Sequence, residues 1–214
     1  MAELIPLLGK LLYPQRIWHG SRKEKILYLT FDDGPIPEVT PWVLELLHQF
    51  QAKATFFCIG ENIEKHPAVF KAILEQGHQV GNHTLEHVNG WKTSSEEYLR
   101  QIHSAQKIMD GYVSTSAKAL FRPPFGKATS SQAREILKNY EIVMWDVLSK
   151  DYEPQITKEN CWKRVLHPTK NGSILVFHDS LKAKKNLEYV LPKVLAHYSK
   201  LGYRFDALYT NLNT

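Results

Sequence analysis

The 214-residue sequence has little cysteine, no long apolar run and no strong excess of one charge. Its two cysteines, Cys58 and Cys161, are too few for a disulfide framework and form no Cys-x-x-Cys pair. Cys58 lies in the apolar run ATFFCIG, which favours a buried free thiol. No apolar stretch is long enough to cross a membrane. The composition therefore gives no sign of a disulfide-stabilised fold or of a transmembrane helix.

The charge balance is only mildly basic. Lysine and arginine total 27, aspartate and glutamate total 22, and the formal net charge is +5. Such a surplus favours an anionic partner such as a cell-wall polymer, a membrane surface or nucleic acid, but a solvated basic surface is the simpler explanation. The short basic cluster Lys182, Lys184 and Lys185 is expected in a solvated loop, so we expect no nucleic-acid partner.

Residues 1–24 are expected to form an N-terminal extension that packs on a domain spanning residues 25–210. The extension has no basic n-region, and Pro6, Lys10 and Pro14 interrupt its apolar residues, so it is a poor signal peptide. A short amphipathic helix that touches a membrane is the alternative. Without a signal peptide the default location is the cytoplasm, although a trimmed N-terminus would leave the location open.

The rest of the chain alternates between short apolar segments and amphipathic ones. Strands are predicted at 26–31, 54–60, 78–83, 119–124, 141–147, 173–179 and 203–208. Helices are predicted from Thr40 as N-cap, from Pro67, from a Ser94–Glu97 capping box, and near 130–139, 158–166 and 187–201. This alternation predicts a single α/β domain with about seven parallel strands, arranged as an open sheet or as a barrel.

Unusual polar residues follow five of the predicted strands. In chain order the segments are TFDDGP, GNHTLEH, FRPPFG, WDVLSKDY and FHD. Because the carboxyl ends of parallel strands meet at one edge of a sheet, we expect these residues to converge on one site.

A metal site is the first expectation for this edge. His83 and His87 are four residues apart, so on a helical turn both rings would face the same way. Alone this spacing is weak evidence, but a carboxylate from another strand end would complete a zinc set with an open position. Glu86 is expected on a solvated face. Of Asp32 and Asp33, one would be neutralised by the cation, and the other would take a proton from the attacking water. A strand-to-turn capping pair is the alternative, but it explains one aspartate rather than two.

Two further strand ends supply an arginine and a histidine. Arg122 precedes two prolines that fix the backbone, so it could pair with the base carboxylate and orient it; a surface ion pair is the alternative. His178 ends an apolar strand, where a satisfied core histidine is more usual, but beside a metal hydrolase site it becomes a candidate general acid. Trp91 is expected either to flank the cleft or to pack in the core.

The five segments together resemble the polysaccharide deacetylase family, the NodB-homology domain of carbohydrate esterase family four. TFDDGP, HTLEH, RPPFG, WDVLSKDY and ILVFHD match its motifs in order, and the resemblance runs from about Ile26 to about Phe205. It implies a distorted (β/α)-barrel, usually counted as seven strands. It also implies metal-dependent removal of N- or O-acetyl groups from chitin-like, peptidoglycan or xylan substrates, often at the cell envelope.

The resemblance implies a role for each motif residue. Asp32 would be the catalytic base, oriented by Arg122. Asp33, His83 and His87 would hold one divalent metal ion. Zinc is the first choice for this metal, and cobalt, nickel and manganese also suit two histidines and a carboxylate.

The remaining roles concern the leaving group and the substrate. His178 would protonate the departing amine, with its charge tuned by Asp151, and the backbone N–H of Phe125 would help to hold the oxyanion. Thr84 would shape the metal-site loop. Contacts with substrate are expected from four residues: Pro124, Phe125, Tyr152 and Val176.

Four positions depart from the usual motifs of the family. Phe125 replaces a tyrosine, Leu148 an aspartate, Tyr152 a tryptophan, and Val176 a common leucine. The expected function is N-deacetylation of an N-acetylglucosamine-containing polymer or oligomer by a monomer. An O-acetyl esterase on xylan-type glycans and a deacetylase of a small non-polymeric substrate are the alternatives. A non-catalytic glycan-binding domain is disfavoured because every base and ligand residue is present.

Overall fold

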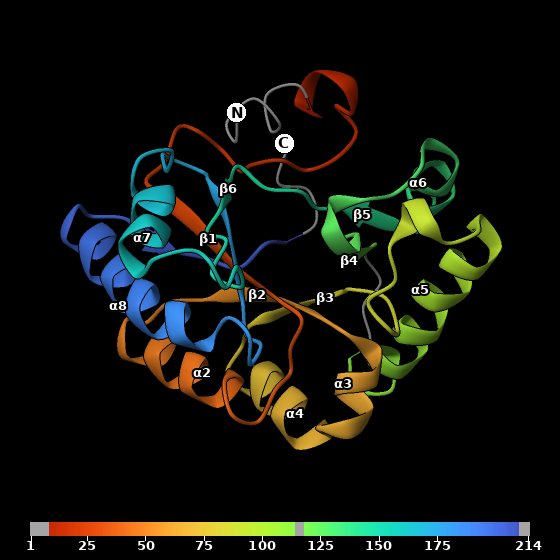
Figure 1. Ribbon diagram of the computed structural model, residues 1–214, viewed down its shortest axis with the longest axis horizontal. Helices are drawn as coiled ribbons and strands as arrows, with labels where there is room; N and C mark the ends of the chain where they lie inside the picture. Colours follow the sequence, from red (N-terminus) through yellow and green to blue (C-terminus); the bar gives the residue numbers. More distant parts are fainter. Residues whose placement is uncertain (1–8, 114–117, 210–214) are drawn as a thin grey trace.

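A parallel sheet forms the centre of the computed structural model, which describes residues 9–113 and 118–209 (Figure 1). Its strands are β1 (Ile26–Asp32), β2 (Ala54–Cys58), β3 (Gln79–Asn82), β4 (Ala119–Phe121), β5 (Tyr140–Ile142), β6 (Val147–Leu148), β7 (Ile174–His178) and β8 (Arg204–Phe205). Seven of them follow the order β5-β4-β3-β2-β1-β7-β6, and β8 pairs with the start of β1. All of these pairings are parallel.

Helices cover the outer side of the sheet (Figure 1). They are α2 (Thr40–Gln49), α3 (Gly60–Lys65), α4 (Pro67–Glu75), α5 (Ser95–Asp110), α6 (Ser130–Ile136), α7 (Lys158–Leu166) and α8 (Lys184–Lys200), with short 3₁₀ turns η1 (Gly90–Lys92) and η2 (Pro124–Gly126). At the start of α5, the Ser94 side chain accepts a hydrogen bond from the Glu97 N–H, which is one half of the predicted capping box, while the Glu97 carboxylate accepts from Arg100 and Gln101 instead. Crossover helices of this kind join neighbouring parallel strands.

The sheet is curled into a distorted barrel. β5 and β6 lie at its two opposite edges, yet residues 143–146 alone connect them. An extended chain spans at most about 3.6 Å per residue, so this link keeps the two edges within roughly 18 Å of each other. The predicted barrel of about seven parallel strands is therefore confirmed.

The N-terminal segment crosses the seam between the barrel edges. Ile17 pairs with Val143 just beyond β5, and His19 pairs with Ser173 just before β7. Ile17 and Trp18 are buried. Residues 17–19 thus contact the barrel, and the packing of the whole extension stays a prediction, since residues 1–8 lie outside the described part of the chain. No helix within 9–113 and 118–209 is long and apolar enough to span a membrane.

Alternate side chains of β1 point into the barrel and into the layer between the sheet and the helices. Leu29 and Phe31 belong to the main apolar cluster, whereas Tyr28 belongs to a separate one, and Thr30 and Asp32 meet a buried arginine. Successive strand residues point to opposite faces, so an apolar segment can end with a carboxylate facing inward.

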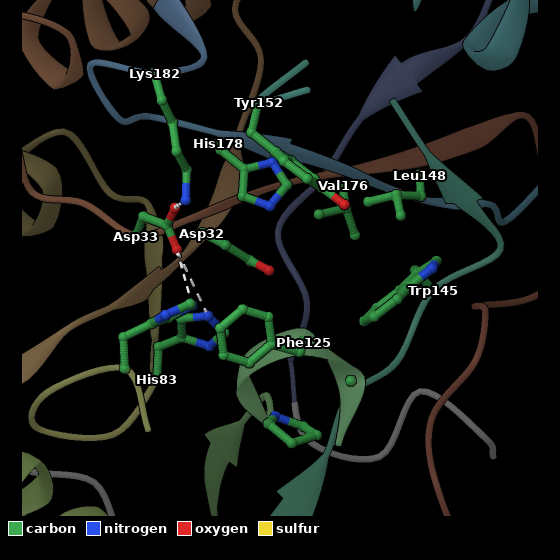
Figure 2. A pocket seen from close by; sticks show the side chains of 13 residues that line it. Asp32, Asp33, His83, Phe125, Trp145, Leu148, Tyr152, Val176, His178 and Lys182 are labelled. Atoms are coloured by element: carbon green, nitrogen blue, oxygen red, sulfur yellow. Dashed lines mark ion pairs between the residues drawn. The ribbon is translucent and has the colours of Figure 1, made fainter. Parts of the chain in front are cut away.

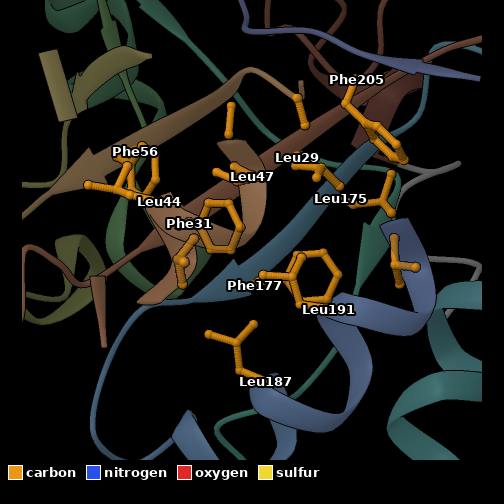
Figure 3. Close-up of a cluster of buried hydrophobic side chains, with 14 of the residues drawn as sticks. Leu29, Phe31, Leu44, Leu47, Phe56, Leu175, Phe177, Leu187, Leu191 and Phe205 are labelled. Carbon is orange, nitrogen blue, oxygen red and sulfur yellow. The ribbon is translucent and has the colours of Figure 1, made fainter. Parts of the chain in front are cut away.

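The main cluster holds the strands in place under the helices (Figure 3). The Phe31 ring stacks on Phe56 at 5.0 Å and on Phe177 at 5.9 Å between ring centroids. All three rings are fully buried, and each such burial stabilises the fold by about 1.5–3 kcal/mol. This packing fixes the carboxyl ends of β1, β2 and β7. Cys58 is buried in the same cluster as a free thiol, as predicted.

Two expectations about elements are wrong. Thr40 is the first residue of α2 rather than its side-chain cap. Its hydroxyl accepts a hydrogen bond from the Ile36 N–H and donates one to Asp179 instead. The single strand predicted over 141–147 is two strands, because Met144 donates its N–H to the Ile17 carbonyl and the chain turns toward the seam.

Candidate functional site

A pocket opens at the carboxyl ends of the strands, and all five polar segments contribute to it (Figure 2). Its lining consists of Asp32, Asp33, His83, His87, Pro123, Phe125, Gly126, Trp145, Leu148, Tyr152, Val176, His178 and Lys182.

The two adjacent aspartates face the same pocket because the backbone leaves the extended strand conformation at Asp33. Simple alternation would send Asp32 and Asp33 to opposite faces. Asp33 instead has a φ of 82°, in the left-handed region that aspartate tolerates better than most residues. Both side chains are almost completely buried and line the pocket. One strand end thus presents two carboxylates with different surroundings.

Asp33 lies beside two imidazoles. Its Oδ1 is 3.3 Å from Nε2 of His87 and 3.9 Å from Nε2 of His83. One ligand atom from each residue lies within 4.8 Å of the others, so the three form a possible metal site. His83 Nδ1 donates to the Arg122 carbonyl at 2.8 Å, which leaves its Nε2 lone pair directed at the site.

The loop that carries both histidines is not helical, so the predicted helical turn is wrong. Thr84 has a φ of 66° and His87 a φ of 57°, and the chain from His83 to Asn89 is irregular, with a bend at 85–86 and no helix. Thr84 supports this loop, since its Oγ1 accepts from the Val88 N–H. Glu86 points away and accepts a hydrogen bond from Gln101, in keeping with its expected solvated position.

The electrostatics of these three residues suit a divalent cation. Burial lowers the pKa of both imidazoles, that of His87 to about 4, so both stay neutral with a free lone pair near pH 7. Burial opposes ionisation of Asp33, but the positive charges of nearby groups, His178 foremost and Lys182 among them, outweigh it and lower the pKa of Asp33 to about 2. Asp33 Oδ1 is buried and has no hydrogen-bond partner among the described residues. An unsatisfied carboxylate oxygen facing two neutral imidazoles fits a bound metal ion.

Asp32 has a different partner. Arg122 is fully buried, and its Nη1 donates to Asp32 Oδ1 at 2.7 Å and to Thr30 Oγ1 at 2.7 Å. Its other nitrogens donate to the carbonyls of Val143 and Met144. Four hydrogen bonds fix the guanidinium and therefore the orientation of Asp32.

His178 is held by Asp151. The Asp151 carboxylate accepts from the His178 backbone N–H and pairs with its Nδ1, each at 2.8 Å. Burial lowers the pKa of His178, but the charge and hydrogen bond of Asp151 overcome this and raise it. The imidazole therefore keeps its proton to higher pH than an ordinary buried histidine.

The rim of the pocket is aromatic and apolar. The Phe125 ring lies 4.7 Å from that of His87 and is 58% exposed, and Tyr152 meets His178 edge-on at 4.6 Å. Val176 also lines the pocket. Pro124 is buried, and the proline in the lining is Pro123, so the predicted substrate contact of Pro124 has no support in the pocket geometry.

Trp91 does not pack in the core. Its side chain is 65% exposed, and Lys127 Nζ lies 4.9 Å from the ring centroid.

Three further residues lie around the site, and their places there were not predicted from the sequence. Trp145 lines the pocket, and only its position beside the fourth motif could have indicated this. Asp179 is fully buried; it accepts from the Gly34 N–H and the Thr40 hydroxyl, and burial raises its pKa to about 8. Lys182, expected in a solvated loop, instead lies 2.9 Å from Asp33 Oδ2. Nothing local in the sequence signals that contact.

Comparison with known proteins agrees with this geometry. The family model described as polysaccharide deacetylase matches residues 19–145. The chain belongs to the polysaccharide deacetylase family. The match covers more than half of the chain and contains the first three polar segments, including both aspartates, both histidines and Arg122.

Relatives of this deacetylase match over most of its length. It is 36% identical over 194 residues to a peptidoglycan-N-acetylglucosamine deacetylase of Bacillus cereus, covering 88% of each chain. It is 37% identical over 162 residues to a chitooligosaccharide deacetylase of Azorhizobium caulinodans, covering 74% of this chain and 76% of that one. The crystal structure of the Bc1960 peptidoglycan N-acetylglucosamine deacetylase superposes with a TM-score of 0.86 at 31% identity, covering 94% of both chains.

Proposed function

We propose that this deacetylase hydrolyses the N-acetyl group of N-acetylglucosamine units in a chitin-like or peptidoglycan glycan and releases acetate. The relatives named above act on peptidoglycan or chitooligosaccharides by their names, and both contain N-acetylated sugars. The observation that carries the proposal is the unequal environment of two adjacent carboxylates. Asp33 faces His83 and His87, whereas Asp32 is paired with Arg122.

Asp32 is the base in this proposal. Its carboxylate lines the pocket, and Arg122 holds one of its oxygens, so the other oxygen would take the proton from the attacking water. Removal of a proton from that water by a positioned carboxylate typically contributes about 10²–10⁴-fold to the rate.

His178 is the acid. The leaving group of an amide is an amine, which must be protonated to depart, and Asp151 keeps the His178 imidazole ready to supply that proton. Hydrolysis of an O-acetyl ester, the alternative reaction, places less demand on this group because an alkoxide leaves more readily than an amide anion. The buried Asp151–His178 pair therefore favours the amide substrate.

Asp33, His83 and His87 would hold a single divalent metal ion through Oδ1 and two Nε2 atoms. When bound, such an ion polarises the acetyl carbonyl and lowers the pKa of water. Two neutral imidazoles and one carboxylate suit Zn²⁺ first, with Co²⁺, Ni²⁺ and Mn²⁺ as alternatives. The Phe125 backbone N–H is the predicted protein donor to the oxyanion.

The test is acetate release from N-acetylglucosamine oligomers before and after chelation, with readdition of Zn²⁺ or Co²⁺. We expect loss of activity on chelation and recovery with metal. Asp33→Ala should lose bound metal, whereas Asp32→Asn should retain it and lose about 10²–10⁴-fold in turnover. Full activity of the metal-free protein, or equal behaviour of the two variants, would contradict the proposal. Acetylxylan in the same assay measures the competing esterase reaction.

A further inference from the structure

Lys182 and His83 lie on opposite sides of the Asp33 carboxylate (Figure 2). Lys182 Nζ is 2.9 Å from Oδ2 of Asp33. The other oxygen, Oδ1, faces Nε2 of His87 at 3.3 Å and Nε2 of His83 at 3.9 Å. The two oxygens of one carboxylate therefore have different partners, an ammonium group for one and two imidazoles for the other.

The oxygen that Lys182 leaves alone is the one that lacks a donor. Asp33 Oδ1 is buried, and no described residue donates a hydrogen bond to it. Burial of a carboxylate oxygen is costly unless a donor or a cation meets it. Lys182 thus pairs with Oδ2 of Asp33 and leaves Oδ1, which faces the imidazoles, without a donor among the described residues.

The backbone around Lys182 is well fixed even though its side chain is 53% exposed. The N–H groups of Ala183 and Lys184 both donate to the Ser180 carbonyl, and Ala183 is fully buried. Lys182 Nζ also lies 5.6 Å from the centre of the Tyr152 ring. A turn anchored by the buried Ser180 and Ala183 therefore directs a solvent-accessible ammonium group to the edge of the pocket.

We propose that Lys182 is a positioning residue for the metal site, which holds Oδ2 so that Asp33 binds through Oδ1 alone and which neutralises part of the carboxylate charge. This inference rests on the proposed function, because it requires a divalent cation at Asp33, His83 and His87. Outer partners of ligating carboxylates orient them and tune the site.

The proposal predicts that Lys182 has opposite effects on metal affinity and on turnover. Lys182 weakens metal binding, because the ammonium group and the cation share the charge of one carboxylate. Lys182 also increases turnover, because a carboxylate that donates less charge leaves the cation a stronger Lewis acid. A residue with a merely structural role would not move metal affinity and turnover in opposite directions.

The test is Lys182→Met, which keeps most of the side-chain length and removes the charge. Affinity of the metal-free full-length protein for Zn²⁺ and Co²⁺ is measured by competition with a chromophoric chelator. We expect roughly tenfold tighter binding. At saturating metal, we expect kcat for acetate release to fall roughly tenfold with KM nearly unchanged. Lys182→Arg keeps the charge and should stay close to the parent in both measurements.

Lys184→Met is the matched control. It removes the same charge two residues away, its side chain is 44% exposed, and its partner is Glu188 at 3.9 Å rather than Asp33. We expect its metal affinity and kcat to equal those of the parent protein.

Three results would overturn the inference. Equal metal affinity in Lys182→Met and Lys184→Met would show that Lys182 does not act on the site. An unchanged kcat at saturating metal would show that Lys182 no longer contacts Asp33 once the ion is bound. A raised KM with unchanged metal affinity would assign Lys182 to the substrate. In each case metal-dependent acetate release by the parent leaves the proposed function standing, whereas failure of the parent to bind either metal removes both.

Discussion

On the floor of the pocket Asp32 and His178 are each held by a buried partner, whereas on its rim Phe125 is exposed and Tyr152 is partly exposed. Arg122 and Asp151, both without exposed surface, hold Asp32 and His178. Phe125 on the rim is more than half exposed. The floor carries the groups that we propose to react, where small displacements are costly. The four positions that depart from the usual family motifs, Phe125, Leu148, Tyr152 and Val176, also line the pocket. We therefore assign the chemistry to the floor and the contacts with sugar to the rim.

The largest effect on stability and activity is expected when Arg122, the buried partner of Asp32, is replaced. Arg122→Met leaves Asp32 buried without its partner, and removing one member of a buried ion pair typically costs about 3–5 kcal/mol of unfolding free energy. Deacetylation should also be lost, because the base is no longer oriented. Denaturant unfolding and acetate release measure the two effects.

The double variant Asp32→Asn with Arg122→Met separates charge from packing. If the unpaired carboxylate causes the destabilisation, the double variant should be more stable than Arg122→Met alone. Equal stability of the two would mean that the lost packing of Arg122 on Phe57, 4.1 Å from the ring centroid, is the main cause.

A smaller, pH-dependent effect is expected at the acid. Asp151 raises the pKa of His178 against the effect of burial, so Asp151→Asn should lower it. His178 must be protonated to act, and a lower pKa means that it loses its proton at lower pH. The alkaline limb of the kcat/KM profile should therefore move to lower pH, with the greatest loss of activity on the alkaline side.

Glu153→Gln is the control for this shift. It removes a negative charge two residues away, from an exposed side chain paired with Lys150 at 3.4 Å. Its pH profile should match that of the parent. An alkaline limb that stays in place in Asp151→Asn would mean that His178 is not the group that limits activity at high pH.

The smallest effect is expected on the rim. Tyr152→Ala removes an aromatic face, and loss of such a contact is worth about 0.5–1.5 kcal/mol, or roughly 2- to 10-fold in KM for a sugar oligomer. Floor geometry should be little affected, so kcat should change less than KM. Tyr152→Trp should restore or tighten binding. A fall in kcat as large as that of a floor variant would remove the distinction between floor and rim.

Prediction from the sequence succeeded best for polar residues at the ends of strands, because both the residue type and its position indicate a place in the site. The strands ending at Asp32 and His178 were predicted within one residue of their observed ends. Their apolar side chains pack in the main cluster, and this packing is why the apolar pattern stops where the strands end. Chemistry alone indicated that the two adjacent carboxylates need different partners, whereas the assignment of the metal to Asp33 and of the base to Asp32 came from the family resemblance.

Other features of the site depend on contacts that local patterns do not encode. The i, i+4 spacing of His83 and His87 predicted a helical turn, but left-handed residues in the loop bring the rings together without one. The contact of Lys182 with Asp33 joins residues 149 positions apart and follows from tertiary packing. The break between β5 and β6 depends on Ile17, which no strand propensity near 141–147 could reveal.

Arg122 has a second role through its main chain. Its guanidinium holds the predicted base Asp32, while its carbonyl accepts the hydrogen bond from His83 Nδ1. The same residue thus orients both the predicted base and an imidazole of the predicted metal site. A displacement of Arg122 would therefore disturb both groups at once, although they lie on different segments of the chain.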